Sequence, residues 1–199
     1  MSVVITGWRS RIAQEFRNLI PEEAAIWGKP LEPGFPVHHP RYLFCHGLLR
    51  PKRKEDQSEF EIGEGYKVNL HSVTQQCNRI FAANRWARIC IIGSESGYRG
   101  SFDEVYADAK RALHGYVETK EIGPGQQLVC ISPGIISDCG MTLVRKDRDA
   151  LEQRRADHPK GRFLTAAEVA KMAYTLLYEQ DYITGTVIRM HGGLKDKAA

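Results

Sequence analysis

Short apolar runs alternate with longer amphipathic segments along this chain. Continuous apolar runs at residues 3–5, 88–92 and 128–131 are each followed within two residues by glycine or proline, as expected for strands buried on both faces. Apolar positions recur at helical spacing between these runs. The alternation predicts an α/β fold in which a doubly wound parallel sheet carries helices on both faces. Further strands are expected at residues 24–27, 42–45 and 182–190.

Two capping-box patterns mark helix starts. Ser101 stands three residues before Glu104, and Thr165 stands three residues before Glu168. In such a box the hydroxyl and the carboxylate each bond a free backbone N–H of the first turn. The pattern predicts helices that begin at Ser101, extending to about residue 120, and at Thr165.

The remaining segments complete one domain over residues 1–199. Apolar residues at helical spacing predict a helix that Pro21 ends and a second amphipathic helix over residues 68–81. The connection over residues 30–40 contains proline and glycine and is not expected to hold a long helix. The polar segment 51–65 is expected to be a surface loop along one edge.

The composition is that of an ordinary globular protein, with 42% hydrophobic and 26% charged residues. A chain of 199 residues can bury enough surface to fold without a disulfide or a metal. The formal net charge is only +4, and the basic-looking stretch 145–162 also contains acidic residues. This favours a solvated mixed-charge face over a nucleic-acid footprint. The acids are Asp147, Asp149, Glu152 and Asp157.

The cysteines favour a reducing, cytoplasmic setting. They are five in number, form no C-x-x-C pair, and two of them, Cys90 and Cys130, lie inside apolar runs. The first residues lack the basic start and long apolar stretch of a signal peptide, and no apolar run approaches the roughly 18 to 20 residues of a membrane span. The seven histidines show no metal-ligand spacing, so we predict no metal site.

Candidate ligand-binding residues follow the apolar runs, because ligands of doubly wound sheets bind beyond the carboxyl ends of the strands. Glycines and hydroxyl side chains are prominent there. Thr6, Gly7, Trp8, Arg9, Ser10 and Arg11 follow the run 3–5, and His46 and Gly47 follow the strand expected at 42–45. Gly93, Ser94, Glu95 and Ser96 follow the run 88–92, and Pro133, Gly134, Ile135, Ile136 and Ser137 follow the run 128–131.

A tyrosine and a lysine four residues apart, Tyr106 and Lys110, lie on one face of the helix that follows Ser94. Tyrosine has a pKa near 10, so Tyr106 can exchange protons near neutrality only if a cation such as the Lys110 ammonium stabilises its phenolate. The pair Tyr116 and Lys120 has the same spacing, but it lies about 80° away around the helix and has no partner like Ser94.

Taken in order, these residues resemble the short-chain dehydrogenase/reductase family, whose fold is Rossmann-like. Ser94, Tyr106 and Lys110 match its Ser and Tyr-x-x-x-Lys signature, and Asn69 resembles its catalytic asparagine. The resemblance covers nearly the whole chain. It also includes Thr6-Gly7 in the first turn, Cys45-His46-Gly47 in place of Asn-Ala-Gly, Pro133-Gly134, and the closing segment from Ile183-Thr184-Gly185 to Gly192-Gly193.

The resemblance implies an NAD(P)-dependent oxidoreductase that interconverts a ketone and a secondary alcohol. Tyr106 would protonate the carbonyl oxygen as hydride arrives from the nicotinamide, and Ser94, or less favourably Ser96, would hydrogen-bond the same oxygen. Lys110 would also hold the ribose hydroxyls, and Asn69 would position a water. The cofactor-binding residues would be Thr6, Gly7, Trp8, Arg9, Ser10, Arg11, Ile12, Lys29, His46, Gly47, Tyr106, Lys110, Pro133, Gly134 and Ile136.

Two departures from the family leave an alternative open. Arg11 and Ala13 replace glycines of the first turn, and the stretch 27–42 is too short for the usual helix and strand. The alternative is a non-catalytic relative that binds or regulates through an impaired cofactor site.

The cations near the expected adenosine ribose favour NADP(H) over NAD(H). Arg9, Arg11 and Lys29 are candidates to pair with a 2′-phosphate, whereas the nearest acid, Glu32, is displaced beyond Pro30. By resemblance, we expect a homodimer or homotetramer acting on a small carbonyl or alcohol substrate whose identity the sequence does not specify. No membrane or nucleic-acid partner is expected.

Overall fold

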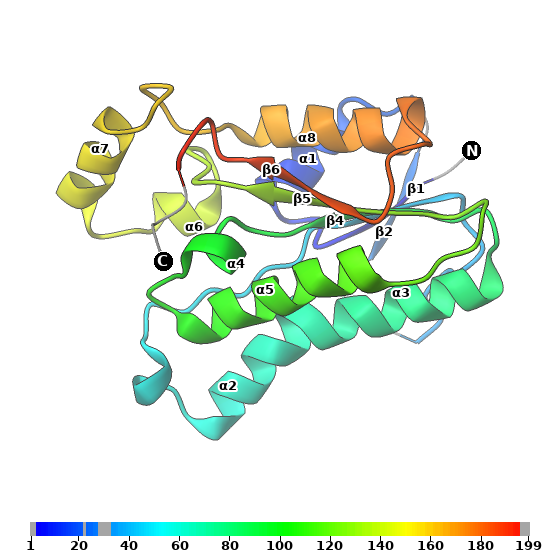
Figure 1. The fold of residues 1–199 in the computed structure, drawn as a ribbon, viewed down its shortest axis with the longest axis horizontal. Helices are drawn as coiled ribbons and strands as arrows, with labels where there is room; N and C mark the ends of the chain where they lie inside the picture. The colour runs from blue at the N-terminus through cyan, green and yellow to red at the C-terminus, as the bar shows by residue number, and fades with distance from the viewer. Residues whose placement is uncertain (1–2, 22, 28–32, 196–199) are drawn as a thin grey trace.

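The protein folds around one six-stranded parallel sheet with strand order β2-β1-β3-β4-β5-β6. The computed structural model describes residues 3–21, 23–27 and 33–195 (Figure 1). Every neighbouring pair of strands is parallel, so the carboxyl ends of all six strands lie at one edge. The strands are β1 (Val3–Thr6), β2 (Ala24–Trp27), β3 (Arg41–Phe44), β4 (Arg88–Ile92), β5 (Gln127–Pro133) and β6 (Thr186–Met190).

Helices cover both faces of the sheet, as the sequence predicted (Figure 1). On one face, α1 (Arg11–Arg17) and α8 (Ala166–Tyr174) pack together over the apolar side chains of the strands. On the other, α3 (Ser72–Ala83) and α5 (Glu104–Thr119) bury a second apolar cluster. The remaining helical segments are η1 (Lys54–Asp56), α2 (Glu59–Tyr66), the π-helical turn η2 (Lys67–His71), α4 (Ser96–Arg99), α6 (Gly140–Leu143), α7 (Arg148–Ala156) and the π-helical turn η3 (Thr175–Glu179).

The strand order reverses between β1 and β3, which places a topological switch point there. From β1 the chain passes through α1 to β2, and from β3 it passes through α2 and α3 to β4 on the opposite side. The loops that follow β1 and β3 therefore diverge, and doubly wound sheets bind their ligands at such a point.

The connection from β2 to β3 is short, and its described part, residues 33–40, contains no helix or strand. Phe35 is buried there, with its ring centroid 5.5 Å from that of Trp27 and 6.3 Å from that of Phe44. The Phe35 side chain thus packs on the face of the sheet beside β2.

Two predictions about helices were wrong. The segment 51–65, expected to be a loop, contains η1 and most of α2, because Ser58 and Glu61 form a capping box that starts α2. Ser101 does not start a helix. Asp103 caps α5 instead, since its carboxylate accepts the backbone N–H of Tyr106 at 3.1 Å.

The other predicted elements are present, and the capping box of Thr165 and Glu168 is confirmed at the start of α8. The last strand begins at Thr186, later than predicted. Within the described ranges, no helix is long and apolar enough to cross a membrane.

Candidate active site

Helix α5 presents three polar side chains, one turn apart, to the carboxyl ends of β3, β4 and β5. Tyr106, Lys110 and His114 follow one another at intervals of four residues, and all three are buried. The Lys110 ammonium lies 5.7 Å from the centroid of the Tyr106 ring. The predicted Tyr106–Lys110 pair is therefore on the inner face of its helix.

The Lys110 side chain is held by main-chain oxygens. Its Nζ donates to the carbonyl oxygens of His46 at 3.0 Å and Ile92 at 3.1 Å. Burial, opposed by the thiols of Cys130 and Cys45, lowers the pKa of Lys110 to about 8. An ammonium has three N–H donors. Within the described part of the chain, two of these bond carbonyls and one is left for a ligand hydroxyl.

Ser94 follows β4. Its Oγ accepts the backbone N–H of Ser96 at 3.2 Å, while Ser96 itself begins α4. Burial raises the pKa of Tyr106, and the neighbouring Ser94 hydroxyl opposes that rise. Burial, rather than the Lys110 charge, thus sets the direction of the Tyr106 pKa.

The other tyrosine–lysine pair with this spacing, Tyr116 and Lys120, takes no part in this arrangement. The Tyr116 hydroxyl donates to Asn78 Oδ1 at 3.0 Å on the neighbouring helix α3.

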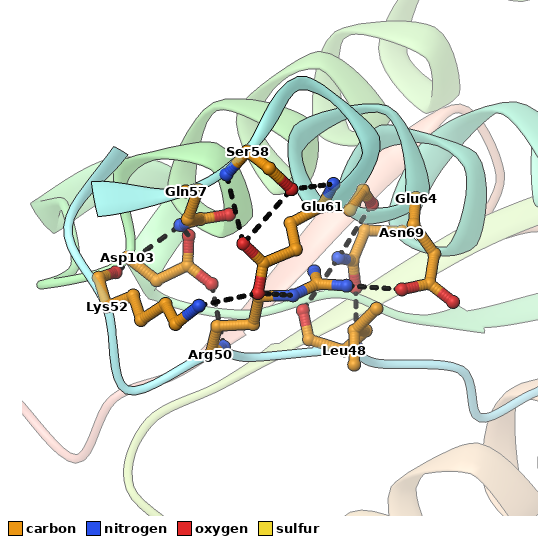
Figure 2. A network of polar contacts seen from close by, with 10 residues as sticks. Leu48, Arg50, Lys52, Gln57, Ser58, Glu61, Glu64, Asn69 and Asp103 are labelled. Atoms are coloured by element: carbon orange, nitrogen blue, oxygen red, sulfur yellow. Dashed lines mark hydrogen bonds and ion pairs between the residues drawn. The ribbon is translucent and has the colours of Figure 1, made fainter. Parts of the chain in front are cut away.

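Asn69 forms hydrogen bonds to the loop after β3 (Figure 2). It is fully buried in the π-helical turn η2. Its Oδ1 accepts from the backbone N–H of Leu48 at 2.9 Å, and its Nδ2 donates to the carbonyl oxygens of Leu48 at 2.8 Å and Gly65 at 2.9 Å. Asn69 therefore fixes the loop after β3, whose His46 carbonyl receives the Lys110 ammonium.

Asp103 holds the same loop from the other end (Figure 2). Its carboxylate is almost fully buried and accepts the backbone N–H of Arg50 at 2.8 Å and the Gln57 side chain at 2.9 Å. The same carboxylate caps α5 at Tyr106. The loop after β3 and the helix that carries Tyr106 and Lys110 are thus tied through one side chain.

The turn after β1 packs directly on the loop after β3. Gly7 has a φ of +66°, and a Cβ at this position would lie 2.5 Å from the Cys45 carbonyl oxygen, so only glycine fits. The Thr6 hydroxyl is hydrogen-bonded to His46 Nδ1 at 3.0 Å. Ser10 caps α1 by accepting the N–H of Ala13 at 3.1 Å.

The predicted cations of this turn differ in their surroundings. Arg11 forms an ion pair with Glu15 at 2.6 Å and lies 3.9 Å from Asp138, whereas the Arg9 guanidinium lies 5.3 Å from the centroid of the Trp8 ring. The residue after Arg11, Ile12, is buried in the apolar cluster to which α8 contributes. Lys29 lies outside the described residues.

The remaining predicted residues lie at the ends of β5 and β3. Gly134 follows β5 and donates its N–H to the Met190 carbonyl oxygen at 3.1 Å, while Pro133 is the last residue of β5. Ile136 is buried and forms an isolated β-bridge with Leu164. A Cβ on Gly47 would lie 2.9 Å from Met141 Cε, which places the short helix α6 against the loop after β3.

Two buried side chains at this edge were given no role from the sequence. Glu95 and His114 are each at most 5% exposed and adjoin Ser94 and Lys110 in the chain or along the helix. Burial lowers the pKa of His114 to about 4. A glutamate after a strand and a histidine on a helix carry no distinctive signal in the sequence. No group of three His, Cys, Asp or Glu side chains is arranged to hold a metal among the residues that the structure describes.

A family model described as enoyl-(acyl carrier protein) reductase matches residues 45–195, which contain Asn69, Ser94, Tyr106 and Lys110. The turn after β1 lies outside the matched region. The family is therefore recognised on the part of the chain that holds the serine, the tyrosine and the lysine.

Three similar proteins illustrate the relationship. A 3-oxoacyl-(acyl-carrier-protein) reductase of Aquifex aeolicus is 35% identical over 74% of this chain and 62% of its own length. An acetoacetyl-CoA reductase of Cupriavidus necator is 30% identical over 64% of this chain and 53% of its own length. The solved structure of a small-chain dehydrogenase in complex with NADPH is 20% identical, with a TM-score of 0.78 and 97% of both chains covered.

The match to the two curated relatives spans less than two thirds of either one. The structural likeness, at low identity, independently supports the fold. Together with the family model over residues 45–195, these findings make the chain a member of the short-chain dehydrogenase/reductase family.

Proposed function

We propose that the protein is an NADP(H)-dependent oxidoreductase that interconverts a ketone and a secondary alcohol. The observation that carries this proposal is the convergence of Ser94, Tyr106 and Lys110. The Ser94 hydroxyl acts to lower the pKa of Tyr106, and the buried Lys110 ammonium lies 5.7 Å from the centroid of the Tyr106 ring. The reductases among the relatives are named for 3-oxoacyl and acetoacetyl groups, which supports a carbonyl substrate.

The residues present fit a nicotinamide cofactor. The third Lys110 N–H would be available to ribose hydroxyls. Thr6 and Gly7 stand at the end of β1, beside the switch point, and Gly134 follows β5. When bound there, the reduced cofactor supplies hydride to the substrate carbonyl carbon.

The chain's own residues would manage the proton. Because its pKa is raised, Tyr106 is protonated at neutral pH and can donate its proton to the substrate oxygen. Ser94 would donate a hydrogen bond to the same oxygen as negative charge develops on it. The Lys110 ammonium would stabilise the tyrosinate that remains.

Replacing the acid tests this proposal. We expect Tyr106→Phe to lower kcat for the reduction of acetoacetyl-CoA by NADPH by about 10²- to 10⁴-fold, because the proton donor is lost. The matched control is Tyr116→Phe on the same helix, which should keep full activity. The measurement is the decrease in nicotinamide absorbance. Undiminished turnover by Tyr106→Phe would disprove the role of this tyrosine.

The alternative is a non-catalytic binding protein, which the replacement of two turn glycines by Arg11 and Ala13 favours. It predicts no turnover of any carbonyl compound by the wild-type protein. If calorimetry also shows no binding of NADPH or NADH at millimolar concentration, the alternative replaces the proposed function.

A further inference from the structure

A buried carboxylate stands immediately after the candidate catalytic serine. Glu95 is 5% exposed, and its Oε1 accepts a hydrogen bond from the Ser132 hydroxyl at 2.9 Å. The Arg189 guanidinium donates to both carboxylate oxygens, from Nε to Oε1 at 3.0 Å and from Nη2 to Oε2 at 2.6 Å. Removing one partner of such a pair is costly because the other charge stays buried.

The Glu95–Arg189 pair joins the turn of residues 94–98, called the serine turn below, to two further strands. Ser132 belongs to β5 and Arg189 belongs to β6, and the two residues lie opposite each other in the sheet. The backbone N–H of Glu95 also donates to the Pro133 carbonyl oxygen at 3.0 Å. Three hydrogen-bonding groups of one residue thus anchor the chain directly after Ser94.

A stack of rings holds the same turn from the side of α5. A Cβ on Gly93 or on Gly97 would lie 2.7 Å from atoms of the His114 ring, so both glycines are packed against it. Tyr98 stacks on His114 with 4.8 Å between ring centroids, and the Arg189 guanidinium lies 4.2 Å from the Tyr98 centroid. The arginine that grips Glu95 therefore also covers this stack.

We propose that Glu95 and Arg189 are positioning residues that hold the Ser94 hydroxyl toward Tyr106. The proposal deepens the proposed function and rests on it. The serine turn has β5 and β6 on one side and α5 on the other, so its backbone cannot rotate while the Glu95–Arg189 pair is intact. A displacement of about 1 Å at a reacting group can lower a rate by about 10²-fold.

A double-mutant cycle tests whether Glu95 acts through Ser94. We expect Glu95→Ala to lower kcat by about 10- to 100-fold in the wild-type background, with little change in NADPH affinity. In a Ser94→Ala background the same substitution should change kcat by less than about twofold, because the group it positions is already absent. Glu95→Gln, which keeps an acceptor for Ser132 and Arg189, should retain more activity than Glu95→Ala. If the double variant loses kcat by the product of the losses in Glu95→Ala and Ser94→Ala, the proposal is overturned.

Amide hydrogen exchange provides a readout without turnover. Glu95→Gln and Arg189→Met should each raise the exchange rate of the backbone amides in residues 94–98 by at least about tenfold, since the anchored turn opens more often. The matched control is Glu168→Gln, which breaks a bidentate pair with Arg162 at the start of α8. It should leave this turn unchanged.

The two experiments separate the possible failures. If the wild-type protein reduces no carbonyl compound but the exchange rates rise as expected, the proposed function fails and the anchoring of the turn stands. Unchanged exchange in both variants would overturn the positioning role, whatever their activity.

Discussion

At the scale of single residues, His114 couples the stability of the fold to pH. Its ring is 3% exposed, and burial together with the nearby Lys110 charge lowers its pKa to about 4. An unfolded chain has histidines with a pKa near 6.5. Between these two values the unfolded state therefore binds more protons than the folded state, so stability is lost as the pH falls through this window.

We expect the free energy of unfolding to fall by about 1–2 kcal/mol more between pH 7 and pH 5 in the wild-type protein than in His114→Phe. Denaturant unfolding at the two pH values measures this difference. Exposed carboxylates with a pKa near 2, such as Asp147 and Glu61, lose their contributions only below about pH 4.5 and do not interfere. Equal pH dependence in the two proteins would show that His114 does not carry this coupling.

The same scale shows which site residues a sequence can supply. Tyr106 and Lys110 could be recognised because the helical repeat alone places residues four apart on one face. The role of Glu95 could not, because its partner Arg189 stands 94 residues later and only the pairing of β5 with β6 brings them together. Asn69 was predicted as a site residue, but its hydrogen bonds to Leu48 join residues far apart in the sequence and could not be predicted.

At the scale of elements, arginines at the amino ends of β3 and β4 support η3, the π-helical turn that continues α8. The last carbonyls of a helix have no partner within it. Here Arg41 Nε donates to the Leu177 carbonyl oxygen at 3.0 Å, and Arg88 Nη2 donates to that of Leu176 at 3.0 Å and also to that of Gln180. The cations also complement the negative end of the helix dipole.

We expect Arg88→Met to lower the free energy of unfolding by about 2 kcal/mol, because it leaves these carbonyls without their charged donor. For a chain of this length that corresponds to a fall in Tm of about 4–8 °C. The control is Arg148→Met, which removes an exposed arginine that donates to the Leu143 carbonyl oxygen at the end of α6. Its effect should stay within about 0.5 kcal/mol. Equal losses of unfolding free energy in the two variants would contradict the proposed support of η3 at the end of α8.

Strands were easier to predict than helix boundaries. The predicted strand 88–92 matches β4 residue for residue, because a strand buried on both faces is largely apolar, and here only Arg88 at its start is charged. The start of α5 was misplaced, because Ser101 with Glu104 satisfies the capping pattern while Asp103 makes the actual cap. A capping pattern states which residues are able to cap, whereas the surrounding fold selects one of them. Here Arg50 and Gln57 hold the Asp103 carboxylate in place.

At the scale of the whole molecule, the sheet is narrow on the side of β1 that binds adenosine in doubly wound folds. The order 3-2-1-4-5-6 common in that class has two strands beyond the first, whereas among the described residues this sheet has only β2. The sequence indicated this through the short stretch between residues 27 and 42. On the proposed function, discrimination between cofactors would then fall to the turn after β1 and to the residues that follow β2.

Within that turn, the two arginines are not equivalent. The guanidinium of Arg11 already has Glu15 and Asp138 as acidic partners, whereas Arg9 lies against the exposed Trp8 ring. A 2′-phosphate would therefore gain more from Arg9 than from Arg11, since a charge-assisted bond to Arg11 competes with its existing ion pairs.

We expect NADPH to bind about tenfold more tightly than NADH, which corresponds to about 1.4 kcal/mol from one charge-assisted contact. Arg9→Ala should remove most of this preference and Arg11→Ala less of it, while Lys29→Ala tests the cation that follows β2. The control is Arg17→Ala, in the last turn of α1 and away from the turn after β1. Titration of each variant with both reduced cofactors gives the ratio of dissociation constants. Tighter binding of NADH, or a preference for NADPH that survives all three substitutions, would mean that these cations do not read the 2′-phosphate.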